Sequence, residues 1–121
     1  MKLKKSDVIA EIELKAVEGE SSKKLVSFGL LKPKKEKKDY VCQIFLKGFE
    51  SKNGVNIYKI YGVNEMQALG MAFSYLIFHV KTKRSQGWKF FYAGKEDSDF
   101  ESRWLVNLAE ERKKAFRRRK G

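Results

Sequence analysis

The stretch that decides the fold runs from Asn64 to Val80 and reads "NEMQALGMAFSYLIFHV". Its apolar residues recur at alternating spacings of three and four, at Met66, Leu69, Phe73, Leu76 and Val80. This spacing is typical of one face of an α-helix. Most of the remaining circumference is apolar as well, which indicates a helix covered on more than one side. We therefore expect a buried central helix that packs on a sheet and on a further element.

The residues ahead of this helix predict where it begins. Asn64 is a suitable N-cap, and Gln67 stands three positions later, which together form a capping box. Gly62 and Asn64 then make the turn that leads from a strand into the helix. We expect these residues to have structural roles and not to form an active site.

The first half of the chain has a period of two, which is typical of half-buried strands. In residues 8–17 the alternation predicts an inner face with Val8, Ala10, Ile12, Leu14 and Ala16. Further strands are expected at 25–31, 40–49 and 55–62, with a charged loop over 32–39 and a hairpin turn at Asn53–Gly54. Four strands with short links predict an antiparallel meander.

The segment after the central helix contains a fifth strand and a second helix start. In residues 87–94, "GWKFFYAG", we expect Trp88, Phe90 and Tyr92 on one face. Ser98 with Glu101 is another capping box, and the helix it opens has an apolar stripe at Phe100, Trp104, Leu105, Leu108, Ala109 and Phe116. The predicted fold is one α+β domain over 1–121. It has a four- to five-stranded, mainly antiparallel sheet on a buried central helix, and its C-terminal helix ends in a basic tail over 112–121.

The helix start resembles that of an uncharacterised family of small bacterial domains. In that family, several strands precede a helix that opens with Tyr-Gly-Val, an acid or amide, two variable residues and Gln-Ala-Leu. The matching residues here are Tyr61, Gly62, Val63, Asn64, Gln67, Ala68 and Leu69, and the likeness spans about residues 8–80. Because no activity is established for that family, the resemblance implies an architecture and no mechanism.

The formal net charge of +12 is the most unusual property of the composition. It creates a field that attracts nucleic acid, anionic lipid or an acidic protein. The basic residues form three clusters, over 32–38, 81–95 and 112–120, and we expect these clusters to share one face. The candidate nucleic-acid contacts are Lys34, Lys35, Lys37, Lys38, Lys83, Arg84, Lys113, Lys114, Arg117, Arg118 and Arg119. The leading hypothesis is an accessory protein that binds nucleic acid or another polyanion non-specifically.

The aromatic residues of 87–94 lie beside the second basic cluster and have two interpretations. If they are exposed, they could stack on unpaired bases. If they are buried, they form an ordinary core strand, and burial is the favoured reading because aromatics are enriched in strands on packing grounds.

The sequence argues against catalysis. His79 is the only histidine and Cys42 the only cysteine, so no cluster of metal ligands can form around them. The sequence lacks the phosphate-binding and metalloprotease motifs. We therefore expect a non-enzymatic protein with no catalytic residues, no metal site and no cofactor.

A single cysteine excludes an internal disulfide and suggests a reducing compartment. The most apolar run has about 15 residues, fewer than the roughly 20 needed to span a bilayer, so we expect a cytoplasmic protein without a membrane span. A homodimer could supply the second cover for the central helix. The alternative function is a protein-binding module for an acidic partner, such as an immunity or antitoxin-like factor or a phage- or plasmid-encoded inhibitor.

Overall fold

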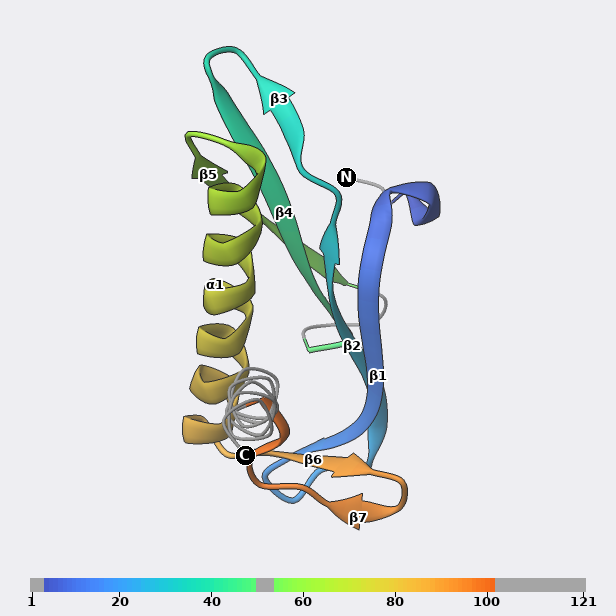
Figure 1. Cartoon of the computed structure of the whole chain (residues 1–121). Helices are drawn as coiled ribbons and strands as arrows, with labels where there is room; N and C mark the ends of the chain where they lie inside the picture. The colour runs from blue at the N-terminus through green and yellow to red at the C-terminus, as the bar shows by residue number, and fades with distance from the viewer. Residues whose placement is uncertain (1–3, 50–53, 102–121) are drawn as a thin grey trace, which may run out of the picture.

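The structure is a computed structural model that describes residues 4–49 and 54–101 (Figure 1). In this part of the chain an antiparallel sheet packs against one long helix, so the fold is α+β. The elements are a 3-10 turn η1 (Lys5–Asp7), strands β1 (Val8–Glu18), β2 (Lys24–Leu31), β3 (Lys34–Glu36), β4 (Asp39–Lys47) and β5 (Val55–Gly62), helix α1 (Glu65–Ser85), and strands β6 (Trp88–Tyr92) and β7 (Lys95–Glu96).

The strands of the described residues form one seven-stranded sheet in which every pairing is antiparallel. β4 pairs with β5 along one edge, while β2 and β3 share its other edge. β1 lies beside β2, and β6 and β7 continue from the end of β1 across one end of the molecule (Figure 1). The predicted meander is confirmed in β1, β2, β4 and β5.

The predicted number of four to five strands is too low, because β3 and β7 are additional. β3 lies inside residues 32–39, which we expected to form a loop. The charged composition of 32–39 conceals the strand, and Pro33, which has no backbone N–H to donate, separates it from β2. The Asn53–Gly54 turn and most of the predicted C-terminal helix lie outside the described residues, although that helix does begin at Phe100 and Glu101.

The start of α1 agrees with the capping prediction. The backbone N–H of Gln67 donates to Asn64 Oδ1 at 2.8 Å, and the Gln67 side-chain oxygen accepts from the N–H of Val63 at 2.7 Å. Gly62 is required where β5 meets the helix, because a Cβ there would lie 2.5 Å from the backbone nitrogen of Ala68. The turn therefore depends on the two capping side chains, Asn64 and Gln67, and on the close backbone approach at Gly62.

The buried stripe of α1 differs from the prediction at its first turn. Leu76 and Val80 are buried as expected, but Met66 is 79% exposed. The remaining buried positions are Ala68 and Ala72, whose small side chains let the helix approach the sheet closely. Met66 is only two residues before the buried Ala68, about 200° around the helix, and so lies on the side away from the sheet. The spacing of the apolar residues alone therefore did not fix which side of the helix faces inward.

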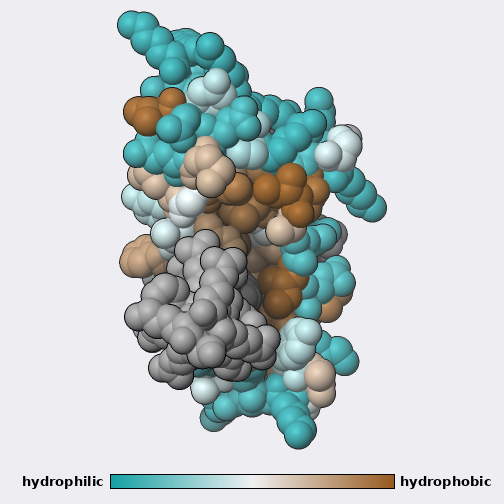
Figure 2. All heavy atoms as spheres, in the orientation of Figure 1, coloured by the Kyte–Doolittle hydropathy of each residue, from teal (hydrophilic) through white to brown (hydrophobic). Residues whose placement is uncertain are grey.

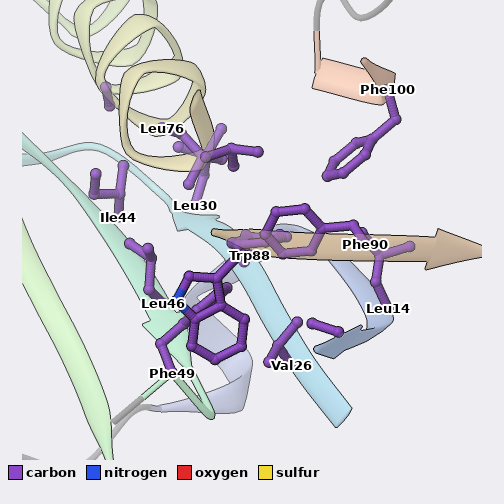
Figure 3. Packing of buried hydrophobic residues seen from close by; sticks show 14 of the residues in the cluster. Leu14, Val26, Leu30, Ile44, Leu46, Phe49, Leu76, Trp88, Phe90 and Phe100 are labelled. Atoms are coloured by element: carbon purple, nitrogen blue, oxygen red, sulfur yellow. The ribbon is translucent and has the colours of Figure 1, made fainter. Parts of the chain in front are cut away.

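The aromatic part of the core forms where β2, β4 and β6 meet (Figure 3). The ring of Phe28 lies 5.1 Å from that of Phe49 and 5.6 Å from that of Phe90, between centroids. Trp88 packs on Phe49 at 4.9 Å. Such offset and edge-to-face pairs add to the free energy gained from apolar burial. This cluster fixes β6 against β2 and the segment that follows β4.

A groove remains open between α1 and β1. It has a volume of about 330 Å³ and is lined chiefly by the apolar residues Ala10, Ile12, Phe28, Leu30, Phe73 and Leu76. Figure 2 shows hydrophobic surface across the middle of this face and hydrophilic surface towards both ends. Within residues 4–49 and 54–101, no helix has both the length and the hydropathy needed to cross a membrane.

Candidate polyanion-binding surface

The first basic cluster is carried by the β3–β4 hairpin, which projects from one end of the molecule (Figure 1). Glu36 pairs with Asp39, so Lys37 and Lys38 form a two-residue loop. Lys35, Lys37 and Lys38 are exposed. Among the described residues, none of these three lysines has an acidic group within ion-pair distance. The hairpin therefore presents three uncompensated positive charges.

The backbone of Lys37 adopts φ = 58°, in the left-handed region. An L-residue with a Cβ is disfavoured there by roughly 1–2 kcal/mol, and glycine or asparagine is the usual occupant of such a turn position. A lysine at this position therefore costs stability while it places a charge at the tip of the hairpin.

The base of the hairpin is fixed to the N-terminal turn through Asp7. Lys34 Nζ lies 2.8 Å from Asp7 Oδ2, and Lys32 Nζ lies 3.5 Å from Asp7 Oδ1. The hydrogen bond from Lys34 lowers the pKa of Asp7 below its usual value. The pair therefore stabilises the fold above the unfolded-state pKa of Asp7, and this contribution is lost as the pH falls through the lowered pKa. Lys34 is thus an anchor, with its charge largely compensated.

A second brace links the hairpin to β5 across β4. The Tyr61 hydroxyl donates to Glu36 Oε1 at 3.1 Å, and Lys59 Nζ lies 3.4 Å from Glu36 Oε2. The hydrogen bond to the Glu36 carboxylate raises the pKa of Tyr61, because it stabilises the protonated hydroxyl. Glu36, which is the only acid within the run of lysines, therefore has a structural partner on the neighbouring strand.

Arg84, in the second basic cluster, is engaged inside the protein. Its guanidinium binds the Glu101 carboxylate in a bidentate arrangement, with Nε at 2.8 Å from Oε2 and Nη2 at 2.9 Å from Oε1. It also lies 5.0 Å from the ring centroid of Phe90 and 4.9 Å from that of Phe100. Arg84 is therefore withdrawn as a nucleic-acid contact. The Glu101 carboxylate accepts hydrogen bonds from Arg84, and no hydrogen bond joins it to Ser98 among the described residues. The predicted capping box of Ser98 and Glu101 is therefore wrong.

The remaining members of this cluster differ in exposure. Lys81, Lys89 and Lys95 are exposed, whereas Lys83 is half-buried, with its Nζ 5.4 Å from the ring centroid of Phe49. Lys83 therefore covers part of the aromatic core with its aliphatic stem while its ammonium stays near the surface.

The first two clusters lie at opposite ends of the molecule (Figure 1). The hairpin stands beside the start of α1, and the second cluster lies around its end. With 21 residues at 1.5 Å each, α1 is about 30 Å long. The two clusters are therefore separated along the length of α1, and their sharing of one face stays a prediction. The third cluster, including Lys113, Lys114, Arg117, Arg118 and Arg119, lies outside the described residues.

The aromatic strand β6 combines both interpretations proposed from the sequence. Trp88 and Phe90 are buried in the core, as the favoured reading predicts. Phe91 is half-buried on the opposite face, and Tyr92 is 55% exposed at the end of the strand. Tyr92 has the same parity as Trp88 and Phe90 but is not buried with them, because the strand reaches past the core before the β6–β7 turn.

The two residues considered for chemistry have structural partners. The buried Cys42 thiol donates to the carbonyl oxygen of Leu31 at 3.1 Å, and burial raises its pKa. The His79 ring stacks on Tyr58 at 4.5 Å, and burial, with a smaller effect of Lys83, lowers its pKa. The described part of the chain contains no group of three or more His, Cys, Asp or Glu side chains placed to bind a metal ion.

The sequence reasoning missed the acidic partners that decide which cations are free. Asp7, Glu36 and Glu101 each bind a residue distant in sequence, between 17 and 27 positions away. One usable signal was present, because Glu36 stands alone among five lysines. The other two pairings depend on how η1 and the end of α1 are placed, which residue spacing does not show.

Comparisons with known proteins give no relative for this chain: no family model, no curated protein and no solved structure matches it.

Proposed function

We propose that this protein is a small non-enzymatic accessory protein that binds nucleic acid or another extended polyanion without sequence specificity. The observation that carries this proposal is the β3–β4 hairpin, where Lys35, Lys37 and Lys38 are exposed and uncompensated. Lys37 stands at a strained backbone position where a smaller residue would be more stable. Strain that is retained at one residue is a reason to look for function there.

The placement of charge favours an elongated ligand over a compact anion. Positive side chains occur at both ends of α1, about 30 Å apart by its 21 residues. A nucleic-acid strand covers that length with about nine nucleotides, at roughly 3.4 Å per step. Residues 102–121 add eight basic and two acidic residues, which is half of the formal net charge. Lys113, Lys114, Arg117, Arg118 and Arg119 are the proposed phosphate contacts in that segment.

The first test removes the basic tail. A form that ends at Glu111 is compared with the full chain for binding to a duplex and a single strand of about 16 nucleotides at several salt concentrations. Each phosphate contact contributes about 0.7 to 0.9 to the slope of log affinity against log salt, so five lost contacts lower the slope by about 4. An unchanged slope, or no binding by the full chain at low salt, contradicts the proposal.

The second test concerns the hairpin alone. The triple variant Lys35→Ala, Lys37→Gly, Lys38→Ala is expected to lower the salt slope by about 2, because three contacts are lost. Glycine relieves the positive φ of Lys37, so weaker binding in this variant does not come from an unfolded hairpin. The matched control, Lys35→Arg with Lys38→Arg, keeps the charge and should keep the slope. Equal slopes for the triple variant and the wild type would remove the hairpin from the binding surface.

A second candidate function is a protein-binding module for an acidic partner, such as an immunity or antitoxin-like factor. The apolar groove between α1 and β1 favours it, because Ile12, Leu30 and Phe73 could receive an apolar segment of a partner. The lysines at the two ends of the molecule would then attract acidic residues that flank such a segment. Failure to bind any polyanion at low salt, with capture of one defined acidic protein, favours this candidate.

A further inference from the structure

A second cavity lies where the β6–β7 turn meets β1 and the start of β2. Its volume is about 350 Å³, within the range of roughly 300–1,000 Å³ that small-molecule sites occupy. The side chains that define its character are Glu13, Lys15, Lys23, Leu25, Phe91 and Tyr92. It combines aromatic rings, two lysines and an apolar wall, and it has no role in the polyanion binding proposed above.

The alternation of the strands builds this cavity on the sheet face opposite α1. Leu14 and Phe90 point into the core, so their strand neighbours Lys15 and Phe91 point the other way. Lys15 and Phe91 are also direct cross-strand partners. The turn at Ala93 and Gly94, both with positive φ, closes the β6–β7 hairpin immediately after Tyr92. Phe91 faces the cavity by this alternation, and Tyr92, the last residue of β6, lines it from the end of the strand beside the turn.

The lysines place positive charge directly against these rings. Lys23 Nζ lies 4.2 Å from the ring centroid of Phe91, a cation–π contact worth about 0.5–1 kcal/mol at an exposed site. A contact of that strength is easily exchanged for one between the ammonium and a phosphate. Two lysines face one carboxylate, that of Glu13, so the cavity retains a net positive charge.

We infer that this cavity binds one unpaired base of a single-stranded nucleic acid, stacked on Phe91 and Tyr92, while Lys15 and Lys23 contact its flanking phosphates. The inference rests on the proposed function and deepens it, because it names single strands as the preferred ligand. A base inside a duplex is stacked between its neighbours and cannot enter such a cavity without being flipped out. Aromatic rings accept any base, so the site adds affinity without sequence readout.

The test compares a base-bearing single strand with an abasic strand of the same length and charge. The wild type is expected to bind the base-bearing strand more tightly. Tyr92→Ala should weaken that binding about fivefold or more, because stacking contributes about 1–3 kcal/mol per base. The affinity of Tyr92→Ala for the abasic strand should equal that of the wild type.

Two control variants accompany this test. Tyr92→Phe keeps the ring and should keep the affinity for the base-bearing strand. Tyr75→Ala, which removes a ring 46% exposed on α1, is the matched control and should change neither affinity.

The outcomes separate this inference from the proposed function. Equal affinity for the two strands, or equal effects of Tyr92→Ala and Tyr75→Ala, overturns the stacking site while binding of the abasic strand still supports the polyanion proposal. Binding of the base-bearing strand alone, lost in Tyr92→Ala, supports the stacking site and contradicts the non-specific phosphate contacts.

A further variant tests the role of Lys23. Lys23→Ala leaves both rings in place and should reduce the salt slope by about 1, because one phosphate contact is lost. An unchanged slope overturns the assigned role of Lys23.

Discussion

Replacing Glu101 by alanine is expected to lower the free energy of unfolding by about 3–5 kcal/mol, because the Arg84 guanidinium would be left without a counter-ion. Glu101 is 1% exposed, and the side chain of Arg84 is 17% exposed. The guanidinium also lies against the rings of Phe90 and Phe100, at 5.0 and 4.9 Å from their centroids, so little of its surface can be hydrated in place of the lost carboxylate. The effect should appear as a lower urea midpoint with the same slope in equilibrium unfolding.

The Glu36–Lys59 pair offers a matched control within the same chain. Its side chains are 40% and 46% exposed, and its atoms are 3.4 Å apart. Exposed pairs contribute about 0.2–1 kcal/mol, so Glu36→Ala should cost at most that amount plus the loss of the Tyr61 hydrogen bond. If Glu101→Ala is no more harmful than Glu36→Ala, the Arg84 pair does not hold the end of α1 in place.

The combined change Arg84→Met, Glu101→Leu tests the source of the loss. Replacing a buried pair by apolar side chains of similar volume is often neutral or stabilising, whereas breaking it is costly. The double variant should therefore recover most of the stability lost in Glu101→Ala. A double variant as unstable as the single one would show that the geometry of the ion pair, and not an uncompensated charge, is what the fold requires.

The elements that the sequence predicted well are those whose pattern depends only on local periodicity. β1, β2, β4 and β5 follow from alternation, and the start of α1 follows from the capping chemistry of Asn64 and Gln67. β3 was missed because three residues are too few to show a period, and its pairing depends on the free edge of β4.

The candidate site was less predictable, because charge is visible in a sequence and pairing is not. Arg84 and Lys35 are both basic residues in basic runs, yet Arg84 binds a buried carboxylate while Lys35 is exposed. Likewise, Phe90 and Tyr92 have the same parity in β6, but only Phe90 reaches the core. Such differences arise from where an element ends and what lies opposite it. Both are properties of tertiary packing.

The same substitution, glycine to alanine, is expected to have opposite effects at Gly29 and Gly70. At Gly29 in β2, a Cβ would lie 2.5 Å from the carbonyl oxygen of Ala10 and inside contact distance of the Phe45 ring. The ring could rotate, but the Ala10 oxygen belongs to the backbone of β1, which pairs with β2 along this stretch. Overpacking of this kind costs about 1–3 kcal/mol, and the rigid backbone places Gly29→Ala towards the upper value.

At Gly70 nothing lies within 4 Å of the added Cβ, and the residue is exposed on α1. Alanine has the higher helix propensity, so Gly70→Ala should raise the free energy of unfolding by about 0.5–1 kcal/mol. The two variants add the same methyl group, so the difference between their urea unfolding free energies isolates the effect of the site. If both variants were stabilised, the close β1–β2 approach at Gly29 would be contradicted. Alanine lowers the conformational entropy of the unfolded chain at either position, so only a steric clash in the folded state can reverse the sign at Gly29.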